Sequence, residues 1–164
     1  MQLREKLLAP YPNLKLVYDK EMPGKFGGLY EKDSEYPFGL ITLSDKLNYY
    51  LQNGHLAEEI GHHETSSGNL LSYYNKPYNV DIARQELRAR RFGHKLVLPL
   101  EKLINCYEHG HWGDIYEMCL CLEIDRSYFN KAIEDYKAKF GNYVNYREYA
   151  ITFEPLTIKK RVSA

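Results

Sequence analysis

The chain is organised around one short stretch, Leu56-Ala57-Glu58-Glu59-Ile60-Gly61-His62-His63. In a helix, residues four positions apart lie on one face, so Glu58 and His62 would point in the same direction. Ala57 and Gly61 are also four apart, and two small side chains let another element approach the helix closely. The stretch therefore predicts a helix with two candidate ligands on one face and room for a close neighbour on another.

The same stretch has the frame of a metal-binding motif with one ligand changed. In the zinc-peptidase motif H-E-x-x-H, the two His bind one metal ion and the Glu activates a water molecule. Here Glu58 takes the place of the first His, while Glu59 keeps the place of the general base. The alternative is that these charged residues form only the solvated face of an amphipathic helix. A third ligand elsewhere in the chain would favour the metal site.

A second helix, expected from Asn79 or Asp81 to about Val97, offers such a ligand. Glu86 shares a face there with small and apolar residues, namely Ile82, Ala89 and Gly93. A carboxylate on such a face is costly unless it is paired, so Glu86 needs a metal ion or a cation beside it. The alternative to a metal is a salt bridge to a nearby arginine, the candidates being Arg84, Arg88, Arg90 and Arg91.

Length and composition limit the class of protein. The 164 residues can bury the core of one domain, with room for a small appendage. Lys plus Arg equals Asp plus Glu at 22 each, so no global positive field attracts nucleic acid, and direct nucleic-acid binding is not expected. Three cysteines make no disulfide framework, and neither a signal peptide nor a membrane span of about 20 apolar residues is expected. A cytoplasmic protein without membrane attachment is the expectation.

The residues before the motif predict a short helix and a small sheet. The helix covers residues 2–8, and three strands are expected at residues 14–18, 29–30 and 38–43. The motif helix is expected to begin near Ser44, a good N-cap, and could break at Asn53-Gly54. Loop and irregular structure are expected over residues 65–78 by composition.

Three short helices are expected after the second motif helix, over residues 100–108, 114–122 and 125–140. The last two are spaced as in a helix-turn-helix, but the second lacks the row of Arg, Asn or Gln that reads base edges. Simple helix packing is therefore favoured over a DNA-binding regulator that uses residues 112–140. The tail that follows alternates weakly and could add strands.

A second candidate metal site lies in this helical region. Cysteine and histidine clusters of this density can bind structural zinc, and the candidates are Cys106, His109, His111, Cys119 and Cys121. In a helix, Cys119 and Cys121 would project from nearly opposite sides, which argues against one shared ion. Free cysteines are also among the residues most often buried in ordinary cores.

Two segments together resemble the ImmA/IrrE family of metallopeptidases. The first runs from Glu58 to His63, and the second is Gln85 to Phe92 followed by Leu96-Val97-Leu98-Pro99. Members of that family typically read L-A-H-E-L-G-H-H and then E-x-E-A-N-x-F-A-x-x-L-L-M-P. The resemblance covers residues 14–140. It implies an α+β fold in which a small N-terminal sheet packs on a zincin-like pair of metal-binding helices, followed by a helix-turn-helix-like region.

The resemblance also implies roles for individual residues. Glu58, His62 and Glu86 would bind the metal ion, and Glu59 would be the catalytic base. The implied activity is a metal-dependent endopeptidase, with zinc or alternatively manganese, that cleaves a helix-turn-helix repressor of a phage or other mobile element. The corresponding division of the chain is a metallopeptidase core, a helical region and a tail, over residues 1–98, 99–141 and 142–164.

Glutamate in the first ligand position changes the expected chemistry. Two carboxylates would neutralise Zn²⁺ more fully than one, making it a weaker Lewis acid, and oxygen ligands favour harder ions such as Mn²⁺. The alternative function is therefore an inactive binding module that regulates a repressor by association. An active site would also need an oxyanion donor, for which the candidates are Tyr73, Tyr74 and Tyr78.

Two further histidines of the motif helix fit the metal less well. His55 lies seven residues before His62, which is about 10 Å along the helix axis. His63 points about 100° away from His62 and is expected to orient a neighbouring group instead. Both stay outside the predicted ligand set.

Overall fold

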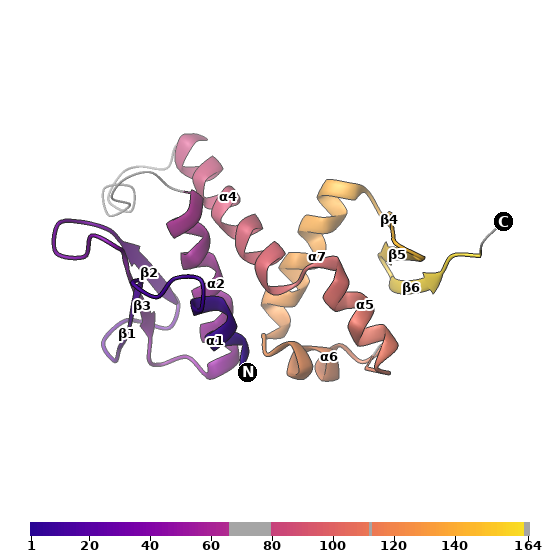
Figure 1. Ribbon diagram of the computed structural model, residues 1–164, viewed down its shortest axis with the longest axis horizontal. Helices are drawn as coiled ribbons and strands as arrows, with labels where there is room; N and C mark the ends of the chain where they lie inside the picture. Colours follow the sequence, from indigo (N-terminus) through magenta and orange to yellow (C-terminus); the bar gives the residue numbers. More distant parts are fainter. Residues whose placement is uncertain (66–79, 112, 163–164) are drawn as a thin grey trace. The chain divides into compact units, whose positions relative to one another are not determined.

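The computed structural model describes residues 1–65, 80–111 and 113–162, and the chain divides into two compact units, Met1–Val97 and Leu98–Ala164 (Figure 1). Each unit combines helices with a three-stranded sheet. The fold is therefore α+β, as the sequence predicts.

The first unit holds a small sheet, one short helix and two long helices. Its elements are α1 (Leu3–Leu8), β1 (Lys15–Asp19), β2 (Gly28–Glu31), β3 (Leu40–Ser44), α2 (Tyr49–Thr65) and α4 (Val80–Val97). The central strand β3 pairs parallel to β1 and antiparallel to β2, and in the second pairing Ile41 lies opposite Tyr30. The apolar run that predicts β3 explains its central place, because Leu40, Ile41 and Leu43 are all buried. The three predicted strands are confirmed.

Helix α2 begins at Tyr49, and the expected start near Ser44 is wrong. The Ser44 hydroxyl donates a hydrogen bond to the carbonyl oxygen of Met22 at 2.7 Å, so it ties a preceding loop to the end of β3. The cap is instead Asn48, whose side-chain oxygen accepts a hydrogen bond from the Leu51 N–H at 3.0 Å. Ser44 and Asn48 are both good capping residues, but the Ser44 hydroxyl is bound to the Met22 carbonyl, which leaves Asn48 to cap the helix.

The expected break at Asn53-Gly54 is also absent, because α2 is continuous through both residues. Asn53 is fully buried, and its side-chain oxygen accepts a hydrogen bond from Nε of Arg4 at 3.0 Å. The Arg4 guanidinium also donates to the Gln52 side chain at 3.1 Å and to the Tyr49 carbonyl at 3.2 Å. A cation from α1 thus satisfies polar groups that would otherwise favour interrupting the helix.

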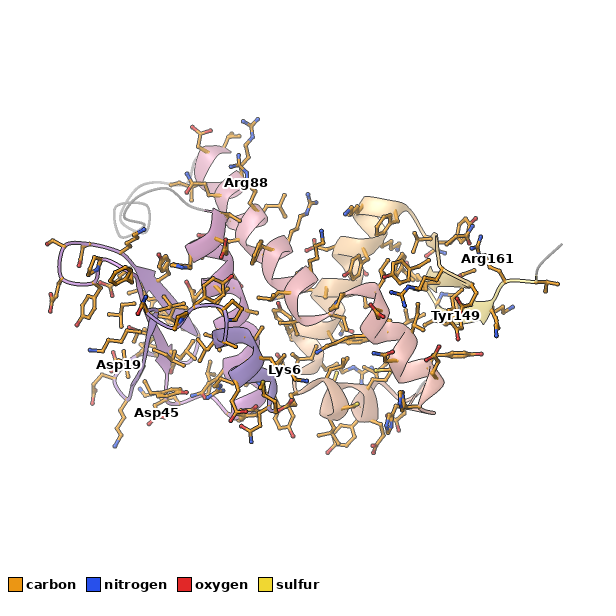
Figure 2. All side chains as sticks on the ribbon, in the orientation of Figure 1. Lys6, Asp19, Asp45, Arg88, Tyr149 and Arg161 are labelled. Atoms are coloured by element: carbon orange, nitrogen blue, oxygen red, sulfur yellow. The ribbon has the colours of Figure 1, made fainter. Side chains whose placement is uncertain are left out.

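Arg4→Ala is expected to lower the free energy of unfolding by about 2 kcal/mol, because the acceptors on Tyr49, Gln52 and Asn53 at the start of α2 lose a charged donor. Urea denaturation followed by circular dichroism measures the change. The control is Lys6→Ala, an exposed residue of the same helix labelled in Figure 2, which should change stability by less than about 0.5 kcal/mol. Equal stabilities of the two variants would contradict the role given to Arg4.

Helix α4 matches the expected second motif helix and ends before Pro99. Its buried side is made by Ala89, Gly93, His94 and Val97. The loop and irregular segment expected between the two helices, including Tyr73, Tyr74 and Tyr78, falls outside the described residues, apart from Thr65, which ends α2.

The second unit contains the three predicted helices, which are confirmed as α5 (Leu100–Glu108), α6 (Ile115–Leu122) and α7 (Arg126–Phe140). Asp114 caps α6, since its carboxylate accepts a hydrogen bond from the Glu117 N–H at 3.2 Å. Asp125 caps α7 in the same way through the Ser127 N–H at 2.9 Å. Each of these caps explains why its helix begins where it does.

The C-terminal segment forms a sheet of three antiparallel strands, β4 (Tyr143–Tyr146), β5 (Tyr149–Phe153) and β6 (Leu156–Lys160). The central strand alternates between buried and half-buried residues, with Tyr149, Ile151 and Phe153 buried, whereas the flanking strands bury only Ile158. Phe153 stacks on Tyr136 of α7, with ring centroids 5.9 Å apart. The weak alternation of the flanking strands explains why the sequence indicates this sheet only faintly.

Within the part of the chain that the structure describes, no helix is both long enough and apolar enough to cross a membrane.

Candidate metal centre

Three polar side chains of the first unit converge where α2 faces α4. Glu58 and His62 are one helical turn apart on α2, and Glu86 comes from α4. Each offers a ligand atom within 4.8 Å of the other two. Nε2 of His62 lies 3.3 Å from Oε2 of Glu86, and the side chains are 1% and 34% exposed. The structure thus brings the three predicted ligands together in a cluster that is buried at His62 and reaches solvent at Glu86.

The two helices can approach this closely because Gly61 has no side chain. A Cβ atom on Gly61 would overlap the carbonyl oxygen of Ala89 and lie 2.7 Å from its carbonyl carbon. Gly61 precedes His62 directly, and Ala89 is one turn beyond Glu86 on α4. The close contact expected from the small residues of the motif therefore fixes the spacing between the ligands of the two helices.

His62 and Glu86 stabilise each other's charged form. Burial lowers the pKa of His62, but its hydrogen bond with Glu86 and the charges of Glu59, Glu86 and Glu58 outweigh burial and raise this pKa overall. The pKa of Glu86 is lowered, first by its hydrogen bond with His62 and further by the charges of His62 and Arg90, against the effect of burial. Glu86 is therefore paired with His62, and the charge of Arg90 contributes less than that pair.

Glu59 lies beside the cluster and is almost completely buried, with 5% of its surface exposed. The pKa of Glu59 is raised to about 8, mainly by burial, with the charge of His62 lowering it and the charges of Glu58 and Glu86 raising it. Among the described residues, its Oε2 atom has no hydrogen-bond partner. A buried carboxylate without a partner is costly in a purely structural role and is typical of a functional site.

A sequence model of one protein family, described as the IrrE N-terminal-like domain of peptidase family M78, matches residues 13–132. This range includes all four residues above and most of the chain. The chain belongs to the ImmA/IrrE family. No curated protein and no solved structure gives a significant match. Membership in this family identifies a metallopeptidase-like domain and agrees with the α+β fold.

The side chains of this ImmA/IrrE domain fit a divalent cation. Three carboxylates, Glu58, Glu59 and Glu86, gather around one imidazole, and a cation would offset their repulsion. Two buried atoms, Oε2 of Glu59 and Nδ1 of His62, have no hydrogen-bond partner among the described residues. A donor set of two carboxylates and one imidazole suits Zn²⁺ and Mn²⁺.

The second candidate metal site does not assemble in the described part of this ImmA/IrrE protein. The cluster of Glu58, His62 and Glu86 is the one grouping there with the spacing of a metal site. Nδ1 of His109 instead lies 2.7 Å from the carbonyl oxygen of Asn105. Cys106 and Cys119 are buried, and burial raises both thiol pKa values to about 11, which disfavours the thiolate that binds metal.

The residues of β2 that border the site were missed by sequence reasoning. Gly28 places its backbone against Glu59, and the Tyr30 hydroxyl is hydrogen-bonded to Nδ1 of His63 at 2.8 Å. In the sequence, Gly27-Gly28 indicates only a turn between strands. Knowing that a strand passes along the motif helix would have been necessary to assign these residues to the site.

Proposed function

We propose that this ImmA/IrrE domain is a metal-dependent endopeptidase that cleaves a helix-turn-helix repressor of a phage or mobile element. The observation that carries the proposal is the convergence of Glu58, His62 and Glu86 within 4.8 Å beside the buried Glu59. Three ligands leave a position free on a tetrahedral ion, which is the arrangement of catalytic rather than structural sites. The repressor as substrate is supported by the family resemblance.

In this proposal the four side chains have separate tasks. Glu58, His62 and Glu86 would hold a divalent cation, which when bound polarises a peptide carbonyl and makes a water molecule more acidic. Glu59 accepts the proton of the attacking water and passes it to the leaving amine. Burial raises the pKa of Glu59 to about 8 in the metal-free protein, and a bound cation would lower this pKa, favouring the carboxylate that accepts the proton.

The proposal is tested by incubating the zinc- or manganese-loaded protein with helix-turn-helix repressors, beginning with any that is encoded beside its gene. Intact-protein mass spectrometry should show two fragments whose masses add up to the repressor plus one water. A repressor that stays whole with both metals would contradict the peptidase. A library of peptides from a digested proteome, treated in the same way, would reveal peptidase activity toward other sequences.

Glu58 favours one alternative, a peptidase fold that binds its partner without cutting it. An additional negative ligand reduces the Lewis acidity of the bound cation, which slows hydrolysis more than it weakens association. Tight binding of the intact repressor, measured by calorimetry in the presence of each metal, would support this alternative. Binding followed by cleavage would exclude it.

Replacing Glu58 by histidine restores the usual ligand at that position. Glu58→His should retain zinc or bind it up to about tenfold more tightly, because imidazole suits zinc and the spacing of four residues is kept. Glu58→Ala should weaken zinc binding by at least about tenfold, since one of three ligands is lost. Calorimetry with zinc measures both affinities. Full zinc affinity in Glu58→Ala would show that Glu58 is a surface acid and that the ligand set is wrong.

A further inference from the structure

Helix α2 carries a second row of functional residues beside the ligand row. His55, Glu59 and His63 are spaced four apart, so they lie on one face of the helix. Strand β2 and the glycine before it contact this face, whereas Glu58 and His62 meet Glu86 of α4. β2 and α2 lie side by side in the first unit (Figure 1). Helix α2 is therefore contacted on two sides. Helix α4 meets the row that holds the candidate ligands, and β2 meets the row that holds the candidate base.

The first two contacts in this row are made by bare backbone. A Cβ atom on Gly27 would overlap the His55 ring, so the ring lies directly on the glycine. A Cβ atom on Gly28 would lie 3.1 Å from Cγ and 3.4 Å from Oε1 of Glu59. The contact with Cγ of Glu59 is tighter than ordinary van der Waals contact, and the same Cβ atom would lie 3.2 Å from Cδ2 of Leu43. A methyl group at Gly28 would therefore press on the Glu59 side chain from one side and on Leu43 from the other.

The third contact is a hydrogen bond at the far end of the row. The Tyr30 hydroxyl and Nδ1 of His63 are 2.8 Å apart, and Tyr30 is only 3% exposed. Gly39 closes the other side, because a Cβ atom there would lie 3.0 Å from the hydroxyl and 3.2 Å from Nδ1. The pair is an enclosed hydrogen bond between β2 and α2.

These contacts matter because no hydrogen bond holds Oε2 of Glu59 among the described residues. Packing contacts therefore contribute to the placement of this carboxylate. A helix that rolls about its axis would swing this side chain through an arc, and contacts at both ends of the row oppose such a roll. Catalytic geometry tolerates errors of only about 0.5 Å. Contacts that limit the roll of α2 therefore help to keep this base in place.

We propose that Gly28, Tyr30 and His63 are positioning residues that aim the Glu59 carboxylate toward the metal centre. The inference rests on the proposed function, since it assigns these residues to the base of that reaction. None of the three is a candidate ligand. Their loss should therefore misdirect the base and leave the metal affinity unchanged.

The test compares two variants with two matched controls. Gly28→Ala adds a methyl group against Glu59, and its control Gly24→Ala adds one 3.1 Å from the flexible Leu47 side chain, at the same closeness but away from the site. Tyr30→Phe removes the hydroxyl bound to His63. Its control, Tyr18→Phe, removes a hydroxyl that accepts a hydrogen bond from Arg4.

Two measurements need no substrate. Zinc affinity by calorimetry should be the same in all four variants. Acetohydroxamate, added to the zinc-loaded proteins, binds the cation and needs a proton acceptor beside it, which Glu59 supplies. Its affinity should fall about tenfold in Gly28→Ala and Tyr30→Phe, as expected for one misplaced hydrogen bond, and stay unchanged in the controls.

A conservative variant separates positioning from general stability. In His63→Asn, the amide oxygen takes the place of Nδ1 and can still accept from Tyr30, so hydroxamate affinity should be kept. His63→Leu fills similar space but offers no acceptor, so this variant should lose hydroxamate affinity. Unchanged hydroxamate affinity in Gly28→Ala, Tyr30→Phe and His63→Leu would overturn the inference. Loss of zinc together with hydroxamate would also overturn it, because the row would then support the whole centre.

A further measurement on the metal-free protein tests the positioning without relying on the proposed function. With ¹³C-labelled glutamate, the carboxyl resonance of Glu59 should move in Gly28→Ala and Tyr30→Phe but not in Gly24→Ala and Tyr18→Phe. A wild-type protein that binds no zinc would defeat the peptidase proposal while this spectrum still decides the positioning. A resonance that stays fixed in all four variants would overturn the inference.

Discussion

Gly61→Ala is expected to destabilise the protein by about 2 kcal/mol, although the same change usually stabilises a helix. Alanine exceeds glycine in helix propensity by about 1 kcal/mol, so propensity alone predicts a gain. Against this, the added Cβ atom would overlap the carbonyl oxygen of Ala89 on α4. Backbone cannot move aside as a flexible side chain can, and overpacking of this kind costs about 1–3 kcal/mol or more. A measured loss of stability would therefore show that the steric overlap with Ala89 outweighs the gain in helix propensity.

The same substitution should also separate the metal ligands. Parting α2 from α4 moves His62 away from Glu86, so zinc affinity should fall together with stability. Urea denaturation and zinc calorimetry measure the two effects, with Gly24→Ala as a control for adding a methyl group at a tight glycine. Ala89→Gly should fail to rescue Gly61→Ala, because the conflict involves the Ala89 backbone and not its side chain. A stable, zinc-binding Gly61→Ala protein would contradict the close helix contact.

Local patterns were sufficient for much of this fold. Spacing of four residues placed Glu58 with His62, and an acid on an otherwise apolar helix face pointed to Glu86. Asp114 and Asp125 marked two helix starts correctly, because each caps its own next turn. In all these cases the deciding interactions span a few residues of sequence, or follow from burial of one helix face.

Contacts between distant segments explain what the sequence did not reveal. Asn53 stays inside α2 because Arg4, forty-nine positions away, donates to it. Ser44 does not cap α2 because its hydroxyl donates a hydrogen bond to the carbonyl oxygen of Met22. Gly28 and Tyr30 meet the motif helix only after β2 has paired with β3. No periodicity within these segments encodes such partners, so they become visible only in the folded chain.

Glu59→Gln is expected to keep the metal and to lower the cleavage rate by about 10²- to 10⁴-fold, the usual contribution of a general base. Glutamine fills the same space but cannot accept the proton of the attacking water. The adjacent acid offers a matched control, because Glu58→Gln should weaken metal binding instead. Rates toward the repressor at saturating zinc, with zinc affinity measured in parallel, separate the two neighbouring residues by role. A Glu59→Gln protein that cleaves at the wild-type rate would remove Glu59 from the mechanism.

Glu59→Gln should also stabilise the metal-free protein, which gives the assignment a test without any substrate. Burial raises the pKa of Glu59 from 4.5 in the unfolded chain to about 8 in the folded one. The folded state therefore holds a proton that the unfolded state releases, so stability is lost as pH rises from about 4.5 toward 8. The neutral glutamine escapes this loss and should raise the free energy of unfolding at pH 7 by about 3 kcal/mol. At pH 4 the two proteins should be nearly equal in stability. Urea denaturation at both pH values measures the difference, and a pH-independent difference would show that Glu59 is not held in a costly buried state for the sake of catalysis.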